Sequence, residues 1–132
     1  MNSGIIIRDA HYPGRASIEA YGNGGFRFAE MSHKGSLLCL PNGMQGWDIL
    51  APAELTLPSL EPILALADRI DVLLIGLGTG IVAIDPAIRA ACRERNIVVE
   101  ATQTGGAVRT YNVLLAEERQ VAAALIAVEN AR

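Results

Sequence analysis

The chain folds around Asp71-Val72-Leu73-Leu74-Ile75-Gly76-Leu77-Gly78-Thr79-Gly80. The run from Val72 to Ile75 is unbroken, apolar and rich in branched residues, which is typical of a short strand buried on both faces. A glycine-rich turn follows directly. Asp85-Pro86 then predict the start of a helix, because aspartate caps helices and proline is favoured at the first helical position. Strand, glycine loop and helix together are how α/β proteins build a site at the carboxyl end of a sheet.

The pattern downstream predicts a parallel βαβ unit. In the helix that begins at Pro86, the residues Ile88, Ala91 and Cys92 recur at helical spacing, and Asn96 ends it. Ile97–Val99 is the second buried strand. A strand, helix and strand of this length form a right-handed crossover with parallel strands.

The C-terminal third contains another turn and two further elements. Residues 102–106 form a turn, and a helix is expected over 107–116 with Val108, Tyr111 and Leu115 on one face. Residues 120–128 are ambiguous. Their alanine content favours a helix, but the same residues fit a buried strand built from small side chains.

The first 50 residues are expected to form strands and turns. Ile5–Ile7 is a short β-branched run. Residues 17–21 and 26–28 alternate around Gly22-Asn23-Gly24-Gly25, which predicts a hairpin. Residues 36–40 form a further apolar strand, closed by the turn Pro41-Asn42-Gly43.

Beyond Gly43, an extended segment containing Trp47 is expected, with the single tryptophan anchoring the β layer. Residues 59–68 are predicted to be a short amphipathic helix with Ser59 as its N-cap, since Leu60, Ile63, Leu64 and Ala67 recur at helical spacing.

Size and composition indicate one α/β domain over residues 1–132. The chain is 51% apolar and 19% charged, which suits a filled globular core. A net charge of −3 gives no electrostatic reason to expect nucleic acid. No run reaches the roughly 18 apolar residues of a membrane span, and no leader segment is evident, so a soluble, cytoplasmic protein is expected. Cys39 and Cys92 lie in apolar patterns and are expected to be buried free thiols.

Polar residues near the two glycine-bearing turns form a candidate ligand site. Arg109 and Asn112 are three residues apart on one helix, and Thr104 could cap the start of that helix. Together with the loop after Ile75 they could hold a small anion at a helix N-terminus. The candidate ligand-binding residues are Gly78, Thr79, Gly80, Thr104, Arg109 and Asn112. The structural alternative is that Thr104 caps, Asn112 satisfies buried backbone groups, and Arg109 pairs with a nearby glutamate.

Several activities are disfavoured by the motifs. The glycine loop lacks the third glycine of a dinucleotide fingerprint, where Ile81 stands, and the helix begins too late to aim its amides at a pyrophosphate. No Gly-Lys-Ser/Thr and no Gly-x-Ser-x-Gly is present. No carboxylate and histidine set has the spacing of metal ligands. We therefore expect no catalytic residue, no metal and no cofactor, and we lean away from an enzyme.

Three segments resemble a known family: Ile75-Gly-Leu-Gly-Thr-Gly80, Val99-Glu100, and Thr104-Gly-Gly-Ala107-Val-Arg109-Thr110-Tyr111-Asn112-Val113-Leu114 with Glu118-Arg119. They are similar to the Mth-type domain-of-unknown-function family. That family includes the mitochondrial respiratory complex I assembly factor three and the adipogenesis-associated Mth-domain protein. The similarity extends over almost the whole chain, and residues 107–112 are its most specific part. The long loop Ile81–Pro86 after Gly80 departs from the family pattern.

The resemblance implies a three-layer α/β fold. Its central mixed sheet has a parallel βαβ core, an N-terminal β-hairpin layer lies beside it, and the last strand runs antiparallel to the others. Residues 120–128 are then a strand. The resemblance also implies a non-enzymatic role in assembling respiratory NADH dehydrogenase in a small bacterial member.

The partner implied is a respiratory-chain subunit or assembly factor, which would place the protein at the inner membrane through that partner. An interface including Trp47 and residues 59–68 is expected, as an apolar patch with a polar rim. The alternative is a small-molecule or anion binder, including an uncharacterised enzyme. Homo-oligomer formation is left open.

Overall fold

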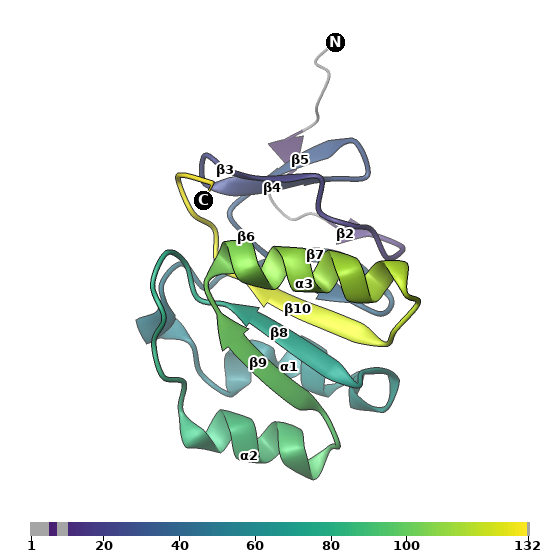
Figure 1. Ribbon diagram of the computed structural model, residues 1–132, viewed down its shortest axis with the longest axis vertical. Coiled ribbons are helices and arrows are strands. Elements are labelled where there is room, and N and C mark those ends of the chain that lie inside the picture. Colours follow the sequence, from purple (N-terminus) through teal and green to yellow (C-terminus); the bar gives the residue numbers. More distant parts are fainter. Residues whose placement is uncertain (1–5, 8–10, 132) are drawn as a thin grey trace.

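A six-stranded mixed sheet forms the centre of the protein in the computed structural model, which describes residues 6–7 and 11–131 (Figure 1). The strand order is β2-β7-β6-β10-β8-β9. The strands in that order are His11–Tyr12, Gly43–Trp47, Ser36–Leu40, Val121–Leu125, Val72–Gly76 and Val98–Thr102. The stretch quoted first therefore supplies β8, next to the last strand of the chain.

The sheet divides into a parallel and an antiparallel half. β8 is parallel to β9 and to β10, with Leu74 opposite both Glu100 and Ala123. β10 is antiparallel to β6, with Ala123 opposite Cys39. The expectation that the last strand runs antiparallel to the others is correct for its neighbour β6 and wrong for its neighbour β8. β10 joins the two halves because it lies between them.

β10 confirms the strand implied by the resemblance and overrides the helical propensity of its alanines. Its residues alternate between the two faces of the sheet: Ala122 and Ala124 face one side, and Val121, Ala123 and Leu125 face the other. All five are buried. Neighbouring strands on both sides bond its backbone, and this pairing outweighs an intrinsic preference of a few tenths of a kcal/mol per residue.

Two cores, one on each face of this sheet, give the fold its three layers. On one face lie α2 (Pro86–Glu94) and the short α1 (Glu61–Leu64), packed against Leu73 and Ile75. On the other lie α3 (Thr104–Ala116) and a second, small sheet, packed around Leu74. The mixed three-layer architecture is therefore confirmed.

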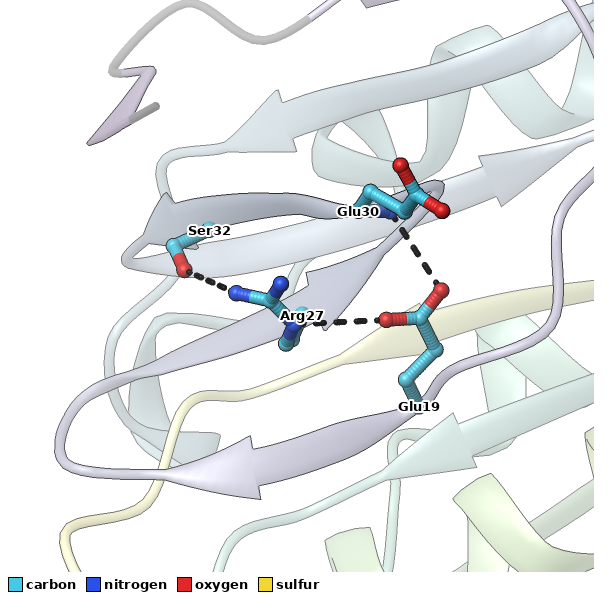
Figure 2. A network of polar contacts seen from close by, with 4 residues as sticks. All are labelled: Glu19, Arg27, Glu30 and Ser32. Carbon is cyan, nitrogen blue, oxygen red and sulfur yellow. Dashed lines mark hydrogen bonds and ion pairs between the residues drawn. The ribbon is translucent and has the colours of Figure 1, made fainter. Parts of the chain in front are cut away.

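The small sheet has four strands in the order β1-β5-β4-β3, which are Ile6–Ile7, Met31–Lys34, Gly25–Phe28 and Ala20–Gly22. The β3–β4 pair is the hairpin predicted around Gly22–Gly25. Figure 2 shows the polar network on this sheet, in which Glu19 forms an ion pair with Arg27 at 3.3 Å. Arg27 donates to Ser32 Oγ, and Glu19 Oε2 accepts from the Glu30 amide, both at 3.3 Å.

The helix α2 follows the sequence closely. Asp85 Oδ1 accepts a hydrogen bond from the Ala87 amide at 2.9 Å, which is the predicted N-cap. Ile88, Ala91 and Cys92 are its buried residues, as the spacing predicted. Asn96 beyond the helix end has φ of 62°, a left-handed conformation that asparagine tolerates. Cys39 and Cys92 are both buried free thiols, as predicted.

The helix predicted over residues 59–68 differs from the observed structure. Residues 59–68 are not one helix but a 3-10 turn over Pro58–Leu60, the four-residue α1, and a second 3-10 turn over Ala67–Arg69. Ser59 is therefore not an N-cap; its hydroxyl instead donates to Thr56 O. Pro58 is the first residue of the first 3-10 turn and Pro62 is the second residue of α1, and neither has an amide hydrogen to donate within a longer helix.

The second strand and the third helix are both longer than expected. β9 continues to Thr102 and is an edge strand, with Val98 59% exposed, so it is not buried on both faces. α3 begins at Thr104, so Gly105 and Gly106 belong to its first turn. Tight packing of that turn against β8 supplies the reason, as described next.

Candidate functional site

The two glycine-bearing bends meet at the carboxyl edge of β8. The Thr104 amide donates to Gly78 O at 2.9 Å, and the Gly78 amide donates to Thr104 Oγ1 at 2.9 Å. Thr104 Oγ1 in turn donates to Ile126 O at 2.7 Å. One hydroxyl therefore ties together the loop after β8, the start of α3 and the segment after β10. The prediction that both bends lie at one rim of the sheet is confirmed.

Glycine is required in this loop for two different physical reasons. A Cβ on Gly76 would lie 2.9 Å from Thr104 Cα, closer than real Cβ contacts, so only glycine lets α3 approach β8. Gly78 has φ of +90°, a conformation that L side chains rarely adopt. These glycines serve close packing and a turn.

A cleft of about 340 Å³ opens beside this junction. Gln103 Nε2 donates to Thr79 O at 2.7 Å, so Gln103 fixes the loop and does not cap its own helix. The first turn of α3 reaches the cleft through Gly105. The lining residues are Tyr21, Gly78, Thr79, Gln103, Gly105, Val128 and Asn130. The cleft can offer hydroxyl, amide and backbone groups to a small ligand.

A second, larger hollow of about 400 Å³ lies along the same loop. Three segments far apart in sequence form its walls, and we call it the loop groove. Its lining residues are Leu50–Pro52, Leu77–Gly80 with Val82, and Ile126–Asn130. Most of these side chains are apolar.

The structure brings only part of the predicted site together. Gly78 and Thr79 line both hollows, Gly80 lines the loop groove, and Thr104 lies directly beneath Gly78. Thr104 is fully buried and does not cap its helix; its hydroxyl is already donor and acceptor within the protein.

Asn112 and Arg109 lie outside both hollows. Asn112 Oδ1 accepts from the Ile18 amide at 2.8 Å, and its Nδ2 donates to Ile18 O at 2.9 Å. This matches the structural alternative for Asn112. Arg109 is exposed and reaches back along α3 toward Gly106. Within the described ranges it forms no ion pair, so the predicted pairing with a glutamate is not seen.

A buried pair, Cys39 and Tyr111, lies on the α3 face of the sheet. Burial raises the pKa of the Cys39 thiol, and the hydrogen bond with Tyr111 offsets part of that rise. Burial also raises the pKa of Tyr111, with the neighbouring Cys39 adding to the effect. The Tyr111 hydroxyl donates to Ala16 O at 2.9 Å. Both groups stay protonated at neutral pH, which suits a core position and not a nucleophile.

Sequence reasoning missed Gln103, Tyr21 and the C-terminal segment 126–130 as lining residues. The signal for Gln103 was its place in the turn after β9, directly before the helix. Nothing local indicated Tyr21, because the β3–β4 hairpin reaches the cleft only through the tertiary fold. The chain segments described contain no group of three His, Cys, Asp or Glu side chains placed to hold a metal ion. None of their helices is long and apolar enough to cross a bilayer.

These features define an α/β domain that resembles solved structures closely. A Bordetella pertussis protein described as a Mth938-like domain superimposes with a TM-score of 0.77 at 25% identity, over 88% of each chain. A Bartonella henselae protein, described as an outer membrane protein, gives a TM-score of 0.87 at 50% identity, over 90% of this chain and all of that one.

The chain belongs to the family described as "Protein of unknown function (DUF498/DUF598)", which matches residues 18–126. It is 33% identical over 119 residues to an uncharacterized protein of Rhodobacter capsulatus, with 90% of both chains covered.

It is also 32% identical over 109 residues to NADH dehydrogenase (ubiquinone) 1 alpha subcomplex assembly factor 3 of Xenopus tropicalis. That match covers 83% of this chain and 60% of the assembly factor. The chain therefore spans somewhat more than half of this relative's length.

Proposed function

We propose that this protein is a non-enzymatic assembly factor for respiratory complex I, the NADH dehydrogenase. The observation that carries the proposal is the relationship to assembly factor 3, which covers most of this chain. The family model matches residues 18–126, which include the β8 loop, α3 and β10. A protein partner, a respiratory-chain subunit or another assembly factor, follows from this role.

The internal chemistry of the domain is consistent with a scaffold. Thr104 and Asn112, two polar residues of α3, form their side-chain hydrogen bonds with the protein's own backbone. Cys39 and Tyr111 are held protonated in the core. Side chains used in this way hold a surface in shape, and that surface is what an assembly factor presents to its partner.

The test is a gene deletion in a respiring host that carries this gene. Assembled NADH dehydrogenase should fall on native gels, and NADH oxidation by isolated membranes should fall with it. Expression of the wild-type chain should restore both. Assembled succinate dehydrogenase serves as the control and should not change. Unchanged amounts of assembled NADH dehydrogenase in the deletion strain would contradict the proposal.

A second candidate function is binding of a small molecule or anion in the 340 Å³ cleft. The observation in its favour is that Gly78 and Thr79 line the cleft together with the first turn of α3. A thermal-shift screen against anions and metabolites tests it. A ligand of this cleft should lose its shift with Thr79→Val and keep it with Arg109→Ala, since Arg109 lies outside the cleft. If no compound shifts the wild-type chain, this candidate is wrong.

A further inference from the structure

Exposed apolar side chains gather at the loop groove. Among the described residues, five large apolar side chains are strongly exposed, and three of them belong to this region: Leu50 at 64%, Ile81 at 74% and Val82 at 48%. Leu50 and Val82 line the groove from opposite segments, and Ile81 precedes Val82 in the same loop. Clustering of this kind marks an interaction surface, whereas single exposed apolar residues are ordinary.

The charged side chains identified at the groove are acidic. The lining segments 50–52, 77–82 and 126–130 contain no lysine, arginine or histidine. Glu129 lines the groove, and Glu54 lies beside it, where its Oε1 accepts a hydrogen bond from the Leu50 amide at 2.8 Å. Within the ranges described, neither glutamate forms an ion pair. Glu54 uses one carboxylate oxygen for the Leu50 amide, and Glu129 Oε2 lies near Gly24 of the β3–β4 turn, so both negative charges lie at the edge of the groove.

The walls of the groove are held in place before any occupant arrives. The Gly78 loop is bonded to Thr104, and Thr104 to Ile126 O. The Asn23 amide donates to Glu129 O at 2.6 Å, which fastens the C-terminal wall to the β3–β4 turn. A preformed surface loses little conformational entropy on binding, so more of the contact energy remains as affinity.

We propose that the loop groove binds an apolar segment of a partner protein that carries lysine or arginine beside its apolar residues. The apolar residues would cover Leu50, Ile81 and Val82, and the basic residues would pair with Glu54 and Glu129. Charge complementarity selects this occupant over an acidic or a purely apolar segment.

A second copy of the chain is a less suitable occupant of the loop groove, because its basic residues would have to come from a different surface. Arg89 and Arg93 lie with Val98 on a separate surface around α2 and β9. Contact between two different patches is head-to-tail and leads to rings or open filaments, not to a closed dimer.

An apolar, basic segment is the kind of partner surface that the proposed assembly role would require. That the segment belongs to a respiratory-chain protein rests on the proposed function, whereas binding in the groove does not. The test of groove binding uses no component of NADH dehydrogenase, so its failure is distinguishable from failure of the deletion experiment. The probes are two synthetic amphipathic peptides of equal length and equal leucine content. One carries lysine at every polar position, and the other carries glutamate.

Fluorescence anisotropy of the labelled peptides against the full chain gives the affinities. The lysine peptide should bind at least about tenfold more tightly than the glutamate peptide. In NMR spectra of the protein, the amide signals of Leu50 and Val82 should shift on addition of the lysine peptide. Equal binding of both peptides, or no binding of the lysine peptide, would overturn the proposal.

Two matched pairs of variants separate the groove from the general surface. Val82→Asp should weaken lysine-peptide binding because it removes an apolar contact. The added negative charge by itself would strengthen binding of a lysine peptide, so weaker binding identifies the apolar contact as the cause. Its control is Val113→Asp, a comparably exposed valine on α3.

Glu54→Gln combined with Glu129→Gln should weaken binding about tenfold, because glutamine keeps the acceptor for Leu50 but loses the charge. Glu94→Gln with Glu117→Gln is its control. All variants should keep the wild-type circular dichroism and unfolding midpoint. If the control pairs weaken binding as much as the groove pairs, the groove is not the site. If sedimentation shows a self-association that Val82→Asp abolishes, the occupant is a second copy and the proposal is wrong.

Discussion

Gly78 and Thr104 are joined by two hydrogen bonds that run in opposite directions, each 2.9 Å long. Together with the bond from Thr104 Oγ1 to Ile126 O, they lock three loops at one edge of the central sheet. Both hollows of the candidate site are built on these loops. The stability of this junction therefore determines whether any surface at this edge keeps its shape.

Thr104→Val is expected to destabilise the protein strongly. Valine preserves the shape of threonine but removes the hydroxyl, which leaves the Gly78 amide and the Ile126 carbonyl without this partner. Unsatisfied buried groups cost about 1–3 kcal/mol each, so a loss of about 2–4 kcal/mol in the free energy of unfolding is expected. Urea denaturation followed by circular dichroism measures it.

Thr104→Ser is the matched control, because serine keeps the hydroxyl and loses only a buried methyl group. It should cost about 1 kcal/mol. If the valine variant is as stable as the serine variant, the hydroxyl does not hold the junction together.

Gly76→Ala and Gly80→Ala should have opposite effects on stability. The methyl group at position 76 would meet Thr104 Cα at 2.9 Å, so α3 must move, and a loss of about 1–3 kcal/mol is expected. Nothing lies within 4 Å of a Cβ at position 80. Alanine there should be neutral or stabilise by up to about 1 kcal/mol, since it restricts the unfolded chain. Thermal unfolding distinguishes the two; equal midpoints would show that the close approach to α3 is unimportant.

Asn112→Asp should give a pH-dependent loss of stability. One carboxylate oxygen can still accept from the Ile18 amide, but the other would face Ile18 O, where Nδ2 donates now. This repulsion raises the folded-state pKa of the new carboxyl above its unfolded value of about 3.9. The protonated form can donate, so its stabilising contribution is present below that unfolded pKa and is lost as pH rises through the folded pKa.

At pH 7 the loss relative to wild type should be about 2–3 kcal/mol, falling toward about 1 kcal/mol near pH 3.5. Asn112→Ala is the control, because it loses both bonds without adding a titrating group. Its deficit relative to wild type should not change between these pH values. A pH-independent deficit for Asn112→Asp would mean that the side chain does not face Ile18 O.

The strongest sequence signals concerned local patterns. The apolar run from Val72 to Ile75 and the Asp85-Pro86 cap each depend on neighbouring residues alone, and β8 and α2 lie where they were expected. β10 shows the limit of such reasoning. Its alanines favour a helix in isolation, and only pairing with β6 and β8 makes the strand. Its direction relative to each neighbour also depends on topology, which explains the error in orientation.

The candidate site was harder to predict because its walls come from distant segments. Gly78 and Thr79 were found from the glycine motif, and the contact between the two bends followed from parallel strands ending at one edge. Whether a polar side chain at this edge faces solvent or the interior depends on how deeply the tertiary fold buries it. Thr104 and Asn112 are polar and well placed on α3. Their side chains, however, form hydrogen bonds with backbone groups 22 and 94 residues away in sequence.

The expectation that Trp47 belongs to an exposed interface patch is wrong. Trp47 is only 8% exposed, and its indole Nε1 donates to Ser59 O at 2.9 Å, so it anchors the core next to the 58–64 turns. Among the described residues, three of the five strongly exposed large apolar side chains are Leu50, Ile81 and Val82 at the loop groove. They lie in loops that carry no periodic signal, and sequence periodicity could not identify them.

The turn between β4 and β5 offers a way to stabilise the domain. Ala29 and Glu30 are its two central residues, and both have positive φ, 49° and 62°. Such two-residue hairpin turns favour Asn-Gly, because other residues in this conformation cost about 1–2 kcal/mol each. Ala29→Asn combined with Glu30→Gly should therefore raise the free energy of unfolding by about 1 kcal/mol, measured by urea denaturation. The Glu30 amide that donates to Glu19 remains in the variant (Figure 2).

Ala53→Gly provides the comparison, since Ala53 lies in the 3-10 turn Pro52–Glu54, has no positive φ, and gains no relief of strain from glycine. That change should destabilise by about 0.5–1 kcal/mol. If the Asn-Gly variant is no more stable than wild type, the left-handed pair in the β4–β5 turn carries no strain. The network of Glu19, Arg27 and Ser32 would then hold this turn at no net cost. Glu19→Gln should in that case lower the free energy of unfolding both in the wild type and in the Asn-Gly variant.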